Sequence, residues 1–148
     1  MGTSVTLNAA PNAHFSFAGW SGACSGTAAC TVAINADTAV AATFQPQIHA
    51  TVNFGTHTSS CTFLQCQPVP GSGMLLISPG GVSCGGTGPT SAICPAPSFA
   101  LGSTVSLTAS PTNGSTFAGW GGDCSTSGSG TTCSLVLDGP KSVLATFD

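Results

Sequence analysis

The stretch from Gly102 to Phe147 reads GSTVSLTASPTNGSTFAGWGGDCSTSGSGTTCSLVLDGPKSVLATF, and a second version of it, GTSVTLNAAPNAHFSFAGWSGACSGTAACTVAINADTAVAATF, runs from Gly2 to Phe44. The block Phe-Ala-Gly-Trp and the two cysteines that follow it align in both copies. The second copy is slightly longer, and the extra residues fall between its cysteines. Such internal repetition predicts a protein built from small, similar modules.

Apolar and polar residues alternate along short segments of both copies and of the region between them. A period of two residues is typical of strands with one buried face, and turn residues such as Pro11, Pro79 and Gly139 separate the segments. The sequence therefore predicts an all-β fold of two small, disulfide-stapled β-sheet or sandwich-like modules with little or no helix. The expected strands are residues 5–9, 31–34, 40–44, 48–54, 74–78, 105–109, 134–137 and 142–147.

A run of proline, glycine and serine at Pro68–Gly73 marks the predicted module boundary. Residues 1–67 then form a first, incomplete module with an extra strand at 48–54 and a small loop between Cys61 and Cys66, and residues 68–148 form a complete second module. The first copy lacks the hairpin that residues 71–101 provide to the second. Because unpaired strand edges are adhesive, we expect residues 48–54 to fold back over the first module or a neighbouring chain to add a strand.

Eight cysteines occur as four close pairs along the chain. Modules this small need staples, and pairing of neighbours is the simplest connectivity, although other connectivities are formally open. Zinc is the rival interpretation, but the chain has no Cys-x-x-Cys pair, so we expect no metal. The predicted disulfides are Cys24–Cys30, Cys61–Cys66, Cys84–Cys94 and Cys124–Cys133.

Charge is scarce: only 3% of residues are charged, against about 25% in ordinary proteins. Lys141 is the single Lys or Arg. A surface that binds nucleic acid or anionic lipid needs clustered cations, so we expect neither partner. Disulfides require an oxidising compartment, which predicts an extracellular or cell-surface location. The first residues have no signal-peptide pattern, so we expect any secretion signal to lie outside this chain. No apolar run is long enough for membrane insertion.

The pattern from Gly71 to Phe147, with ISPGGVSCG, GSTVSLTASP, GSTFAGWGGDC and KSVLATF, resembles the bacterial divergent InlB B-repeat family. Residues 2–44 resemble only the second half of such a unit, and residues 48–67 have no counterpart in the pattern. The resemblance implies an extracellular, β-rich module that is often arranged in tandem. It implies no enzymatic activity.

No catalytic constellation stands out from the residues. The stretch Gly19-Trp20-Ser21-Gly22-Ala23 only faintly resembles a Gly-x-Ser-x-Gly block; a disulfide loop follows it, and the second copy has Gly121 in place of Ser21. His14, His49 and His57 are not duplicated. His57 with Cys61 and Cys66 could be drawn as part of a metal site, but no fourth ligand is evident. We therefore expect no enzyme and no cofactor.

Trp20 and Trp120 allow two interpretations. Each lies in a Phe-Ala-Gly-Trp strand beside a disulfide, where an indole would fill a small core. Exposed tryptophans would instead stack on sugar rings in a carbohydrate-binding module. Asn113 begins an Asn-Gly-Ser sequon and is a possible glycosylation site.

These observations together favour a structural role on a bacterial surface. We expect a cell-surface stalk, an adhesin module or a filament subunit. Its partners would be tandem repeats of the same protein or further copies that associate by strand addition. The alternative is a polysaccharide-binding module that uses Trp20 and Trp120.

Overall fold

The computed structural model describes residues 2–62 and 65–148, and it describes their side chains except at residues 57–62 and 65–67. Strands account for 59% of the chain and helix for 2%, which confirms the predicted all-β fold. Helix in the described part is limited to one 3-10 turn, η1 (Ser125–Ser127). This turn lies where the second repeat copy has its extra residues. None of the described helical segments has the length and hydropathy of a membrane span.

The first repeat copy folds into two separate antiparallel ladders. β1 (Thr3–Leu7) pairs with β3 (Cys30–Ile34). β2 (Phe15–Gly22) pairs with β4 (Val40–Pro46), and a bulge interrupts their register between Phe17 and Gly19. Gly19 has φ of 146°, a backbone conformation that residues with a Cβ atom rarely adopt, which explains a glycine at this bulge.

The second copy forms the same two ladders. β11 (Thr104–Pro111) pairs with β13 (Thr132–Val136), as β1 pairs with β3. β12 (Phe117–Gly122) pairs with β14 (Lys141–Phe147), as β2 pairs with β4, and the bulge recurs. The duplicated sequence therefore specifies the same strand pairing twice.

Strands from the region between the copies extend only the second copy's ladders. β8 (Ser72–Ser78) pairs with β11, and β9 (Val82–Thr87) with β8. β5 (Ile48–Phe54) pairs in parallel with β14, and β10 (Ala92–Ile93) pairs with β5. The result is two four-stranded sheets, ordered β13-β11-β8-β9 and β10-β5-β14-β12.

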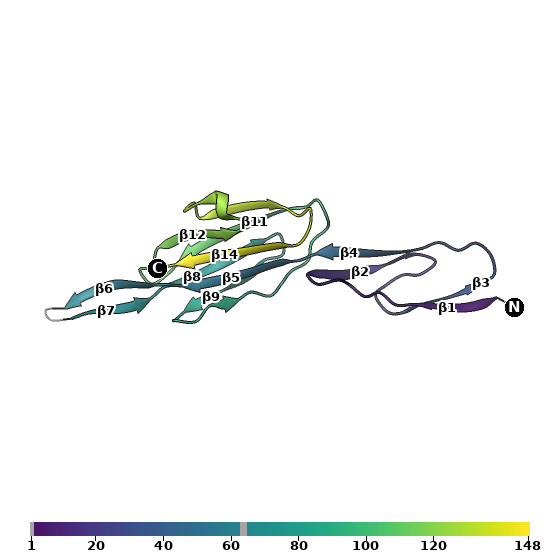
Figure 1. Ribbon diagram of the computed structural model, residues 1–148, viewed down its shortest axis with the longest axis horizontal. Coiled ribbons are helices and arrows are strands. Elements are labelled where there is room, and N and C mark those ends of the chain that lie inside the picture. The colour runs from purple at the N-terminus through teal and green to yellow at the C-terminus, as the bar shows by residue number, and fades with distance from the viewer. Residues whose placement is uncertain (1, 63–64) are drawn as a thin grey trace.

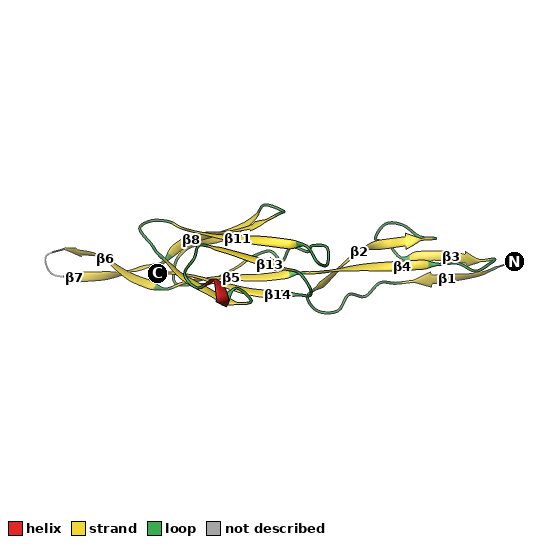
Figure 2. Ribbon diagram, turned by 90° about the horizontal axis from the view of Figure 1, so that it is seen from above, coloured by secondary structure: helices red, strands yellow, loops and turns green. Residues whose placement is uncertain are grey.

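The two sheets pack as a sandwich around one core (Figure 2). Alternate side chains of their strands point between the sheets, as the period of two requires. Phe147 and Trp120 are the large aromatic residues of this core. Its other fully or nearly fully buried members are Ile48, Ala50, Val52, Leu75, Ile77, Cys94, Val105, Leu107, Ala109, Cys124, Cys133, Leu137, Val143 and Ala145.

A hairpin that the sequence did not predict follows β5. β6 (Thr56–Thr62) and β7 (Gln65–Pro70) pair antiparallel, with Cys61 opposite Cys66 in the register. The sequence predicted only a small loop between Cys61 and Cys66 in this segment. Proline is disfavoured in strands, and β7 contains Pro68 and ends at Pro70, so residue preferences argued against a strand here.

The molecule is elongated, as Figure 1 shows. The N-terminus lies at one end, beyond β1 and β3, and the β6–β7 hairpin forms the other end. The chain passes from β4 to β5 through Gln47 alone. β5 therefore extends the first copy directly into the sandwich. It lies before the predicted boundary at residues 68–73 but packs in the second copy's core; the division into residues 1–67 and 68–148 stays a prediction.

Candidate functional site

The first copy exposes an apolar face that the second copy buries. Val5 is 39% exposed and Phe44 37%, whereas their counterparts Val105 and Phe147 are completely buried. Leu7 and Ile34 are likewise exposed, and their counterparts Leu107 and Leu137 are buried. Nearly identical residues in identical ladders thus differ in burial because only the second copy has covering strands.

The covering strands bring their own apolar side chains. Leu75 and Ile77 of β8 and Ile48 and Val52 of β5 are all fully buried against the second copy. Residues 48–54 had been one of two candidates for covering the first module's edge. That candidate was wrong, because β5 pairs along its whole length with β14.

Two cavities open on the uncovered face of the first copy. One has a volume of about 290 Å³ and is lined by Val5, Leu7, Val32, Ile34, Thr38 and Val40. The other, of about 190 Å³, is lined by Ala10, Asn12, Phe15 and Phe44. Both are predominantly apolar. An exposed apolar surface of this kind marks an interaction site more often than a free surface. We define the residues lining the two cavities as the open face.

A third cavity, of about 270 Å³, lies where the two copies meet. It is lined by His14, His49, Asp123, Pro140, Lys141 and Ser142. Nδ1 of His14 and Nε2 of His49 are 2.9 Å apart, and the rings meet edge to face. Partial burial, and then the neighbouring His14, lower the pKa of His49. Asp123 accepts a hydrogen bond from the Ser142 amide. Its charge also acts on Lys141, and all three residues belong to the second copy.

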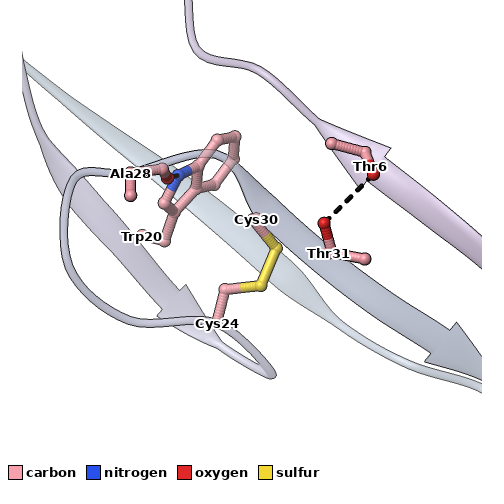
Figure 3. Close-up of a disulfide and its surroundings, with 6 residues drawn as sticks. All are labelled: Thr6, Trp20, Cys24, Ala28, Cys30 and Thr31. Atoms are coloured by element: carbon pink, nitrogen blue, oxygen red, sulfur yellow. Dashed lines mark hydrogen bonds between the residues drawn. A yellow bond between two sulfur atoms is a disulfide. The ribbon is translucent and has the colours of Figure 1, made fainter.

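Each tryptophan is tied to its own disulfide loop. Figure 3 shows Nε1 of Trp20 donating to the Ala28 carbonyl beside the Cys24–Cys30 bridge, at 2.8 Å. Nε1 of Trp120 donates to the Gly130 carbonyl at 2.6 Å. Trp120 is 8% exposed and belongs to the core, while Trp20 is half-buried. An open hollow of about 260 Å³ borders Trp120 and is lined mainly by small residues.

Three of the four expected disulfides are present: Cys24–Cys30, Cys84–Cys94 and Cys124–Cys133. The fourth, Cys61–Cys66, and the His57 side chain lie outside the described side chains. No group of three or more His, Cys, Asp or Glu within the described part is placed to hold a metal ion.

Asn113, the glycosylation candidate, is exposed at the turn after β11. It adopts a positive φ of 52°, and its Nδ2 donates to Oγ of Ser72. Ser72 also contacts Thr112 through its hydroxyl and accepts through its carbonyl the Thr112 amide. The Asn113 side chain therefore helps to hold the start of β8 on β11.

Sequence reasoning missed two parts of this arrangement. The pairing of His14 with His49 joins residues that are distant along the chain, and neither carries a motif. The exposure of the open face could be predicted only in part, because the sequence shows that the first copy lacks a hairpin but does not show where β5 pairs. It depends on which ladder β5 joins, and the alternation of β5 does not specify its partner.

Comparison with protein families matches the divergent InlB B-repeat domain over residues 1–48 and 82–148. The match includes both repeat copies and the strands β9 and β10, and it omits β6, β7, β8 and all of β5 except its first residue. Searches of the curated proteins and of the solved structures return no match.

Proposed function

The chain belongs to the divergent InlB B-repeat family, and from this premise we propose that it is a force-bearing structural module of an extracellular stalk, adhesin or fibre, without catalytic activity. Its family suggests an extracellular repeat module, and its disulfides are compatible with that location. The proposal adds a mechanical task to this general assignment.

The observation that carries the proposal is the parallel pairing of β5 with β14. Seven register pairs join the two strands, from Lys141 opposite Ile48 to Phe147 opposite Phe54. The chain enters β5 directly from the first copy, and it leaves β14 at the C-terminus. Tension between the two chain ends therefore pulls the start of β5 and the end of β14 in opposite directions.

Opposed pulling on parallel strands loads their hydrogen bonds in shear. The bonds of a parallel ladder are evenly spaced. In shear they share the load, so the ladder fails as a whole and does not open one pair at a time. The buried side chains of both strands, including Ile48, Val52 and Phe147, must leave the core in the same step. Both features suit a module that transmits tension along a stalk or fibre.

Single-molecule pulling tests this role. Handles at the two chain ends should give a weak early event for the first copy, which has little core, and a strong later event for the sandwich. Moving the C-terminal handle to the exposed turn at Asp138–Gly139, which precedes β14, keeps the fold but peels β14 from the end that faces Ile48. We expect the strong event to weaken markedly in that geometry.

Equal rupture forces in the two geometries would contradict the mechanical role, because they would show that the β5–β14 ladder does not set the resistance. The reducing agent is a second control. These disulfides close loops with sequence separations of 6, 10 and 9 residues, so their reduction should lengthen the extended chain by at most that many residues per bridge.

We also propose that such modules join by strand addition at the first copy, whose ladders lack covering strands. Polysaccharide binding is the second candidate, since an open hollow borders Trp120. Trp120 itself is 8% exposed and offers little ring surface for stacking on a sugar. The structural role is therefore the one that the side-chain arrangement favours.

A further inference from the structure

We infer that the open face of the first copy is an acceptor for the β8-type strand of another repeat unit of the same family, inserted alongside β1. The inference rests on the proposed structural role and names the partner that would join to this module. This face is uncovered in the first copy, whereas β8 covers the equivalent face in the second copy.

The smaller cavity corresponds to the place that the first residues of β8 occupy in the second copy. Its lining residues Asn12 and Phe44 are the counterparts of Thr112 and Phe147. In the second copy, Ser72 hydrogen bonds to Thr112, and Gly73 lies so close to the Phe147 ring that a Cβ there would overlap it. A strand that begins Gly-x-Gly therefore fits over this phenylalanine, and the cavity at Phe44 is the empty equivalent.

The larger cavity includes Leu7, whose counterpart Leu107 pairs with β8, while the counterpart of Val5 lies just beyond the β8 register. Its lining residues Val5 and Leu7 are the counterparts of Val105 and Leu107 in β11. In the second copy Leu107 lies opposite Ile77 in the register, and Ala109 opposite Leu75. Leu75 and Ile77 are fully buried there. The occupant is thus an extended strand with apolar residues at alternate positions after the glycines.

The aromatic cluster beside the acceptor already has the arrangement of the filled copy, although β1 ends at Leu7 whereas β11 continues to Pro111. Phe17 lies 5.1 Å from Trp20 and 5.4 Å from Phe44, measured between ring centroids. The corresponding distances in the filled second copy, from Phe117, are 4.9 and 5.4 Å. A surface that keeps its bound arrangement before binding avoids most of the ordering cost of association.

The chain cannot satisfy this acceptor from its own segments. Its β8 is engaged with β11, and each chain has two acceptor strands, β1 and β11, for one β8. Exchange between copies would fill one acceptor only by emptying another. Nor can β5 cover the edge of β4 in its own chain, because parallel pairing needs a long crossover and Gln47 is the whole connection. The donor is therefore a β8-type strand that is not engaged with a β11 strand of its own unit.

Charge does not oppose such joining. The donor strand, GSGMLLIS, is uncharged, and only 3% of all residues in the chain carry charge. The open face therefore selects its occupant by shape and by the spacing of apolar side chains. The backbone groups of the added strand would pair along the free edge of β1.

The test uses the full chain and a labelled synthetic peptide of residues 71–88, which contains β8 and β9. We expect binding with one peptide per chain, and NMR shifts at residues 6–11, the counterparts of those that β8 contacts in the second copy, without equal changes at residues 106–111. Peptide carrying Leu75→Ser and Ile77→Ser should bind at least about tenfold more weakly, because two buried apolar side chains are lost. Peptide carrying Met74→Ser and Leu76→Ser is the matched control, since both residues are exposed on the opposite face of β8.

Failure of the wild-type peptide to bind a monomeric chain would overturn the inference. Equal loss of binding in both substituted peptides would also overturn it, because recognition would then not follow the buried face of β8. If chains instead pair through their open faces and the peptide cannot separate them, a second copy is the occupant and the inference is wrong. None of these results alters the pulling experiment, which loads the β5–β14 ladder.

Discussion

His14 and His49 form a direct hydrogen bond across the junction of the two copies, with Nδ1 of His14 2.9 Å from Nε2 of His49. One ring nitrogen has to donate and the other to accept, so the bond requires at least one unprotonated ring. The backbone reinforces this contact, since the amide of Gln47 donates to the His14 carbonyl. The pair therefore links the loop before β2 to the start of β5.

Acid should weaken this junction. The pKa of His49 is lowered in the folded protein, so the unfolded chain binds its proton more readily. The stabilising contribution is complete above the ordinary pKa of about 6.5 and is lost as pH falls through that value and then through the lowered folded one. The effect should be small because His14 is exposed and His49 only partly buried. Asp123 and Lys141 are the other ionisable side chains that line the same cavity.

NMR titration of the two rings, with thermal melts between pH 8 and pH 5, measures this effect. His49→Gln should remove most of this pH dependence. An unaltered pH dependence in that variant would show that another group is responsible.

Gly73 should tolerate no side chain. Its added Cβ would overlap the buried ring of Phe147, so we expect Gly73→Ala to lower the free energy of unfolding by about 1–3 kcal/mol. Gly86 lies opposite Gly73 in the β8–β9 register and has open space where its Cβ would be. Gly86→Ala is therefore the matched control, with a change within about 0.5 kcal/mol. Chemical denaturation of both variants decides the point; similar losses would mean that strand propensity, and not the Phe147 contact, sets the cost.

The sequence predicted the local pairing well and the long-range pairing poorly. Both copies carry the same alternation around Phe-Ala-Gly-Trp, so the strands and disulfide loops at Cys24 and Cys124 could be located from residues alone. The alternation in Ile48–Phe54 shows that one face is buried, but it does not show against which strand. Topology decides that, because a parallel partner cannot be reached through Gln47 alone. For the same reason the contact of His14 with His49 could not be predicted, because it also depends on how distant segments pair.

The two tryptophans should behave differently towards quenchers. In single-tryptophan variants made by Trp20→Phe or Trp120→Phe, acrylamide should quench the half-buried Trp20 more strongly than the 8% exposed Trp120. Trp120→Ala should cost about 3–5 kcal/mol of stability, as for other large core residues. Trp20→Ala should cost less, since its copy has no closed core. Protection of Trp120 from acrylamide by oligosaccharides would contradict the structural role of this side chain and favour the sugar-binding alternative.

The duplicated disulfides should contribute to different unfolding steps. Cys124 and Cys133 are buried in the sandwich core, and replacing both by alanine should lower its free energy of unfolding by roughly 2–3 kcal/mol from loop closure, with a further packing loss. The equivalent replacement of Cys24 and Cys30 is the matched control. It lies in the open first copy, so the sandwich transition should stay within about 0.5 kcal/mol of the wild-type value, as expected for distant sites. A large shift of the sandwich transition in the control would mean that the two copies unfold as one unit. The folding of the first copy would then depend on the sandwich, and the His14–His49 contact would be one interaction that couples the two.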